Sequence, residues 1–263
     1  MFTVAPPDKT GPQALLHLQS LGNNFIPAFH PSQPVALECR LATTIDDLLA
    51  IQDLRRIAFY ADVEGELEDE APNYRYEETR FDDHCDHLML IDHNTGSVVA
   101  TCRVLSGLRS LDGMDFSAAQ EFDLEPFDHH RRETTEFSLI CLHPEYDPVA
   151  LQQHLFRAMT AYARANNSRY LLGAVSLDTG EPKVGAAIFG SLTRQQVAPV
   201  EWQTAPCPAW ASPLCSISDE NASYPRVLQH HLSLGAKICA PPAIDRRFNT
   251  VSFLVLHTLA AAA

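Results

Sequence analysis

Four charged residues lie at or near the ends of apolar runs, where their side chains could do chemistry. A cation among carboxylates suits the recognition of a zwitterion such as an amino acid. A carboxylate also suits the removal of a proton from an attacking amine, since an amine with a pKa of about 8 is mostly protonated at neutral pH. Ion-pair networks place charges in similar surroundings, so the residue types leave a structural and a catalytic role open. The four residues are Asp83, Asp86, Arg103 and Glu136.

The elements that position Glu136 are predicted by the pattern around it. Residues 133–146, ETTEFSLICLHPEY, are polar at first, then apolar, and the run stops at a His-Pro pair. Such a short run predicts a buried strand. Residues 148–166 then place apolar side chains on one helical face, and 169–177 (RYLLGAVSL) are strand-like. The order strand, helix, strand predicts a right-handed parallel crossover.

The other patterns predict a mixed sheet with helices on its faces, in one α/β domain over residues 34–258. A Pro-rich extension over 1–33 precedes it, and the acidic stretch 62–83 is predicted to be a loop that covers part of the fold. The further predicted elements are a strand at 35–41, a helix after the N-cap Thr44, a hairpin of 87–92 with 98–105, a loop at 106–132, a helix at 181–194, an irregular connection at 198–217, a helix at 224–234 that ends at Gly235, and strands at 236–239 and 250–257.

Composition restricts the partners and the compartment. The formal net charge of −14 over 263 residues argues against nucleic acid, whose phosphates bind Lys and Arg, and against a generally basic membrane-binding face. The seven cysteines form no CxxC pair, which favours a reducing compartment. No secretory signal and no apolar segment of about 20 residues is visible. These features predict a cytoplasmic protein.

Motifs for nucleotide-dependent enzymes and hydrolases are absent from the sequence, which has no GxGxxG, Walker or GxSxG pattern. The run His84, Cys85, Asp86 and His87 contains metal-ligand residue types, but neighbouring side chains on a strand point in opposite directions. An ordinary strand entrance is therefore favoured over a zinc site, and no metal is expected.

Several segments, taken in order along the chain, carry a family resemblance. They resemble the hemolysin-like GNAT acyltransferases, in the branch of ornithine-acyl carrier protein N-acyltransferases, and more distantly the N-acyl amino acid synthases and acyl-homoserine lactone synthases. The resemblance runs from about Leu37 to Leu256. The segments are RFDDHCDHLMLID, VVATCRVL, SAAQEFDL, EFSLICLHPEY, RYLLGAVS, LGAKICAPPAIDRRFNT and SFLVL.

This resemblance implies a GNAT fold, with a mostly antiparallel sheet that splays apart at its centre around the phosphopantetheine arm of a thioester donor. Strands 133–143 and 169–177 would border the opening, where backbone N–H groups would bind the thioester oxygen. Glu136 would be the base, and Arg103, Asp83 and Asp86 would shape the amine pocket. Ser138, Cys141 and Ser176 are the further substrate-binding residues expected.

The donor implied is an acyl carrier protein, because residues 143–148 lack the glycines with which acetyl-CoA enzymes of the superfamily bind pyrophosphate. Arg131, Arg132 and Arg157 would dock that acidic protein, and peripheral membrane contact would be compatible with a lipid product. No resident cofactor is expected. The chain departs from its relatives at Leu139, where they have Arg, and at Ser252, where they commonly have Asp.

The predicted function is transfer of a medium or long, possibly 3-hydroxylated, fatty acyl chain to the amino group of ornithine or another small amine. Two alternatives remain open at this point. One is an acyl-CoA-dependent enzyme that acts on a different amine, and the other is a non-catalytic binding module that keeps the fold.

Overall fold

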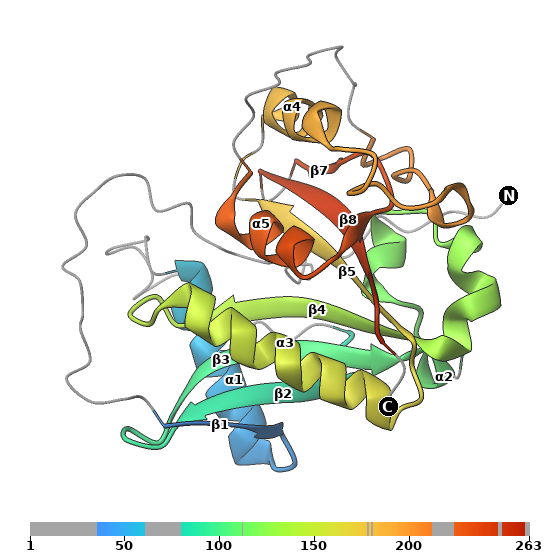
Figure 1. Ribbon diagram of the computed structural model, residues 1–263. Coiled ribbons are helices and arrows are strands. Elements are labelled where there is room, and N and C mark those ends of the chain that lie inside the picture. The colour runs from blue at the N-terminus through green and yellow to red at the C-terminus, as the bar shows by residue number, and fades with distance from the viewer. Residues whose placement is uncertain are drawn as a thin grey trace, which may run out of the picture.

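The computed structural model describes residues 36–60, 80–111, 113–177, 179, 181–211, 224–246 and 249–260. The predicted extension 1–33 and most of the acidic stretch 62–83 lie outside these residues. Eight strands form one sheet in the order β1-β2-β3-β4-β5-β8-β6, and β7 pairs with β8 (Figure 1). The strands are β1 (Leu37–Leu41), β2 (Asp86–Asp92), β3 (Ser97–Ser106), β4 (Thr134–Leu142), β5 (Tyr170–Leu177), β6 (Lys237–Ile238), β7 (Ala243–Asp245) and β8 (Thr250–Thr258).

Only the β4–β5 pair is parallel among the strands described. It is the crossover predicted from the sequence, and the other pairs make the sheet mostly antiparallel. The helices are α1 (Ile45–Tyr60), α2 (Gly107–Ser110), α3 (Pro148–Ala165), α4 (Pro182–Ser191) and α5 (Arg226–Ser233), with 3-10 turns η1 (Ser117–Gln120), η2 (Glu125–Glu133) and η3 (Val200–Trp202). Residues 106–132, predicted as a loop, therefore overlap three helical segments, two of four residues and a 3-10 helix of nine.

Local signals in the sequence set the ends of the main helices. Thr44 Oγ1 accepts a hydrogen bond from Asp47 N at 3.1 Å, which confirms Thr44 as the predicted N-cap of α1. Asp47 Oδ2 accepts one from Thr44 N at 3.1 Å, so the capping is reciprocal. Asp147 caps α3 by accepting from Val149 N at 3.1 Å. Gly235, with φ at +85°, follows α5 in the left-handed conformation typical of a helix end.

The two faces of the sheet differ in chemistry. Helix α3 crosses one face, with α5 beside it over β8, and α1 lies behind the sheet in Figure 1. We call the first the α3 face; its core includes Val104, Phe137, Val175 and Phe253. We call the other the α1 face; strand alternation gives it Arg103, Leu105, Glu136, Leu172 and Leu254. The charged residues of the centre thus project from the α1 face.

The centre of the sheet opens between β4 and β5. These strands pair only where residues 134–136 meet 170–172, although both continue further, and β5 turns away with β8 (Figure 1). The Phe137 ring lies beside Gly173, where an added Cβ would come within 2.5 Å of it. The large ring therefore needs glycine on β5 at the point where the strands separate.

A β-bulge lies in β4 at the same level. Thr101 pairs with Cys141 and Arg103 with Ser138, so two residues of β4 oppose Cys102 alone. One of the two is Leu139, with φ at 48°, a left-handed conformation that is unusual for a leucine. The bulge gives β4 an irregular backbone beside the opening.

Among the described residues, no helix is both long enough and apolar enough to cross a bilayer.

Candidate active site

Glu136 lies on β4 at the last paired position before the sheet opens. Its side chain is 1% exposed, and its two oxygens accept hydrogen bonds from the backbone N–H groups of Ser117 and Ala118, each at 2.8 Å. Burial raises the pKa of Glu136 to about 7, while these hydrogen bonds and the charge of Arg103 act to lower it. A carboxyl group with such a pKa exchanges its proton near neutral pH, as a general base must.

Arg103 is fully buried on β3, directly opposite Ser138. Its Nη1 lies 3.8 Å from Asp82 Oδ1, and its guanidinium lies 5.4 Å from the centroid of the Phe81 ring. Asp82 also receives a hydrogen bond from Arg55 at 2.9 Å. The carboxylate partner of Arg103 is therefore Asp82, a residue that the sequence analysis did not single out.

Asp83 and Asp86 do not join this group. Asp83 is exposed. Asp86 of β2 lies opposite Val104 of β3, so its side chain lies on the α3 face. There it forms an ion pair with Arg109 at 2.6 Å and accepts a hydrogen bond from the Tyr162 hydroxyl at 2.6 Å. The expectation that Asp83 and Asp86 shape the amine pocket is therefore corrected, because Asp83 is exposed and alternation along β2 directs Asp86 away from Glu136.

The three smaller predicted residues are all buried, and alternation puts them on the α1 face. Ser138 faces Arg103 across the β3–β4 ladder. Cys141 packs with Ala58 and Leu139. The Ser176 hydroxyl is hydrogen-bonded to that of Ser252 at 2.9 Å.

Sequence reasoning missed two further carboxylates on this side of the sheet. Glu121 directly follows η1, and Asp245 ends β7. Both are buried, and the charges of Asp245 and Glu136 help to raise the pKa of Glu121 to about 7, behind burial as the main cause. Glu121 lies in the segment SAAQEFDL, which carried part of the family resemblance. That segment was the signal in the sequence from which Glu121 could have been found.

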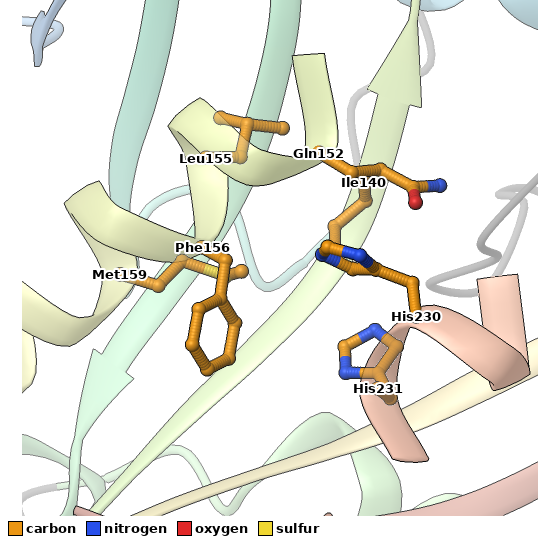
Figure 2. A pocket seen from close by; sticks show the side chains of 7 residues that line it. All are labelled: Ile140, Gln152, Leu155, Phe156, Met159, His230 and His231. Carbon is orange, nitrogen blue, oxygen red and sulfur yellow. The ribbon is translucent and has the colours of Figure 1, made fainter. Parts of the chain in front are cut away.

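On the α3 face, a small apolar pocket lies between β4, α3 and α5. Figure 2 shows side chains of the two helices facing each other beside Ile140. The cavity measures about 10 Å³, room for one water molecule. Its lining residues are Ile140, Gln152, Leu155, Phe156, Met159, His230 and His231.

The histidines beside this pocket are held neutral. His231 Nδ1 lies 2.9 Å from His257 Nε2, and the His231 ring stacks on Phe137 with centroids 5.4 Å apart. Burial lowers the pKa of His257 to about 4 and that of His231 well below its ordinary value. The pocket is therefore uncharged at neutral pH.

The predicted docking arginines differ in environment. Arg131 is buried, forms ion pairs with Asp115 and with Asp128 (3.1 Å), and packs over the Phe116 ring. Because its charge is already neutralised within the fold, its predicted docking role is corrected. Arg132 and Arg157 are exposed.

Comparison with known proteins agrees with this geometry. The family model of the acetyltransferase (GNAT) domain matches residues 54–156, which include Arg103 and Glu136. An L-ornithine N(alpha)-acyltransferase of Agrobacterium fabrum (strain C58) is 25% identical over 234 residues, covering 84% of this chain and 80% of the relative. One of Rhodobacter capsulatus is 26% identical over 233 residues, covering 85% and 90%. The chain is a GNAT-fold N-acyltransferase.

The fold of this N-acyltransferase is also similar to the crystal structure of the AHL synthase LasI. The two match over 87% of this chain and 92% of that one, with a TM-score of 0.50 at 11% identity. The predicted mixed, splayed sheet is confirmed, and so is the predicted class of enzyme.

Proposed function

We propose that the enzyme transfers a medium or long fatty acyl chain, including 3-hydroxy chains, from an acyl carrier protein thioester to the amino group of an amino acid such as ornithine. The observation that carries the proposal is Glu136, a buried carboxyl group with a pKa of about 7 beside the opening of the sheet. The names of the relatives support ornithine as the acceptor. The product is an N-acyl amino acid.

In this reaction Glu136 accepts a proton from the acceptor nitrogen. The nitrogen then attacks the thioester carbon, a C–N bond forms and the C–S bond breaks. The nitrogen loses its second proton as the amide forms, and the leaving sulfur takes up one proton to become the thiol. Glu136 keeps two backbone N–H donors throughout, so its position is fixed while its charge changes. Arg103 stabilises the charged form of Glu136.

The bulge at Leu139 supplies the group that stabilises the thioester oxygen. Its extra residue interrupts the β3–β4 ladder beside the opening, and a bulge re-aims local peptide groups. In this proposal backbone N–H groups of the bulge bind the oxygen as it gains negative charge.

The donor arm approaches from the α3 face, where the uncharged pocket at Ile140 suits the apolar part of an acyl thioester. The acceptor approaches Glu136 from the α1 face. Because the pocket holds only about one water, side chains such as Phe156 and His230 must move when the arm binds.

The N-terminus of α3 favours a carrier protein over CoA. A helix start can bind a diphosphate through free N–H groups. Here Pro148 has no N–H, and the Asp147 carboxylate accepts from Val149 N, so a negative charge occupies the position. The nucleotide end of CoA would be repelled, whereas carrier-bound phosphopantetheine lacks that end. Arg132 and Arg157 are the exposed cations proposed to dock the acidic carrier.

The test is a competition between carrier-bound and CoA-bound donors of equal chain length, followed through the amount of N-acyl product. We expect the carrier donor to be preferred by about tenfold or more in kcat/KM, and charge reversal at Arg132 or Arg157 to raise KM for the carrier donor alone. Arg194→Glu, at an exposed site after α4, is the matched control. Equal use of both donors would replace the carrier protein with acyl-CoA in this proposal.

A further inference from the structure

A second polar group lies beyond Glu136 on the α1 face. Asp245 opposes Thr250 across the β7–β8 ladder, and Ser252 lies two residues further on the same side of β8. Ser252 is hydrogen-bonded to Ser176 and also to Glu121, whose pKa this contact helps to lower. Strands β5, β7 and β8 and the residue that follows η1 thus bring two carboxylates and three hydroxyls to one buried place.

Two buried atoms of this group have no hydrogen-bond partner in the described part of the chain, Glu121 Oε2 and Thr250 Oγ1. The two side chains are 4% and 2% exposed. An unsatisfied polar atom at such a depth is destabilising, so a group with hydrogen to donate would be bound there.

The charges around Glu121 specify which kind of donor fits. The charged neighbours that act on its carboxyl group are Asp245 and Glu136, both acidic. None of the ion pairs found among the described residues includes Glu121. An ammonium group has three hydrogens to donate, and its positive charge would stabilise the negative charge of Glu121 beside these acidic neighbours.

We propose that Glu121, Asp245 and Thr250 bind the second ammonium group of a diamino acid whose reacting amine lies at Glu136. The inference rests on the proposed function and assigns the residues that would select its acceptor. The N–H groups of η1 bind Glu136, and Glu121 directly follows the same turn, so the two ends of one small molecule can be held along a single polar strip. Glu121 would then be the residue that sets specificity for diamino acids.

The test compares ornithine with norvaline, which has the same carbon chain but no terminal amine. A charge-assisted hydrogen bond favours the wild-type enzyme's reaction with ornithine by about 10- to 100-fold in kcat/KM. Glu121→Gln should lose about 10- to 100-fold with ornithine and stay within about threefold of wild type with norvaline. Glu201→Gln, at an exposed site in η3, is the matched control and should change neither value.

Thr250→Val removes only the hydroxyl and serves as a second variant if Glu121→Gln fails to fold. It should lower kcat/KM several-fold with ornithine and leave norvaline unaffected. Equal losses with both acceptors in either variant would overturn the subsite. Equal wild-type rates with ornithine and norvaline would also overturn it, while leaving the proposed function intact. Failure to acylate any amine would overturn the proposed function itself, and the subsite with it.

Discussion

Replacing Glu136 with Gln tests the proposed base with little change of shape. The amide oxygen of Gln can accept from one of the two N–H groups that now bind the carboxylate, Ser117 N or Ala118 N. The other N–H loses its acceptor, at a cost of about 1–3 kcal/mol. The variant also removes a buried charge. Burial raises the pKa of Glu136 from 4.5 to about 7, so above pH 7 the charged carboxylate lowers the free energy of unfolding by about 3 kcal/mol. The Gln variant does not carry this cost. We therefore expect Glu136→Gln to fold with near wild-type stability at pH 8.

The linked change in stability has a definite sign. The folded protein holds the Glu136 proton more tightly than the unfolded chain, so this stabilisation is complete below pH 4.5 and is lost as the pH rises through about 7. The Gln variant lacks this dependence. Its free energy of unfolding should thus fall less between pH 4.5 and pH 7 than that of the wild type.

The effect on catalysis should be much larger. Loss of a general base lowers the rate by about 10²- to 10⁴-fold. The wild-type kcat/KM should also fall about tenfold for each pH unit below about 7, as the carboxyl group gains its proton. The assay measures N-acyl product by chromatography from pH 5.5 to 8.5, with Glu201→Gln as the control for a neutral substitution. A folded Glu136→Gln protein with the wild-type rate and pH profile would refute the reasoning.

Four further substitutions test the packing, the donor side and a buried histidine. Gly173→Ala should lower the free energy of unfolding by about 1–3 kcal/mol in denaturant titration, and Phe137→Leu should recover part of it because the smaller side chain removes the clash; simple additivity of the two changes would contradict this contact. Ile140→Trp should fill the apolar pocket and raise KM for the acyl donor at least about tenfold, and an equal rise in KM for the amine would count against a donor site there. Burial lowers the pKa of His257 from 6.5 to about 4, so the folded protein holds this histidine neutral. The neutral form contributes stability to the fold above pH 6.5, and this contribution is lost as the pH falls toward 4. His257→Gln should flatten the pH dependence of unfolding in that range, and an unchanged slope would show that His257 is not the group responsible.

Much of the frame followed from local patterns in the sequence. The parallel crossover was predicted from three neighbouring patterns: the apolar run of β4, the periodic apolar face of α3 and the apolar run of β5. A strand that is buried on both faces of a sheet has such a continuous apolar run, and a helix packed on the sheet has one apolar face. Thr44 and Gly235 marked helix ends through capping chemistry that involves only neighbouring residues. These features depend on short-range physics, which a sequence displays directly.

The charged site was harder to predict because it depends on which way each side chain points. The segment DDHCD offers three aspartates within five residues, and a shift of one position reverses the face. Asp82, in the turn before β2, reaches Arg103, whereas Asp86 faces Tyr162. Nothing in the pattern distinguished among them.

Other errors arose from contacts between segments that are irregular. Arg131 is neutralised in part by Asp115, which lies in a stretch without periodicity. Glu121 follows a 3-10 turn, and Asp245 belongs to a strand of three residues. Such elements are formed by tertiary packing, so their contribution to the site becomes visible only in the folded chain.

The central claim, acyl transfer to an amine, is tested most directly by mass spectrometry of the reaction products. The purified enzyme would receive acyl carrier protein loaded with chains of increasing length, together with a pool of amino acids and small amines. We predict a product whose mass combines one acyl chain and one amine, with ornithine among the acceptors used. An intact thioester and no combined product across the whole pool, from a protein shown to be folded, would contradict the claim.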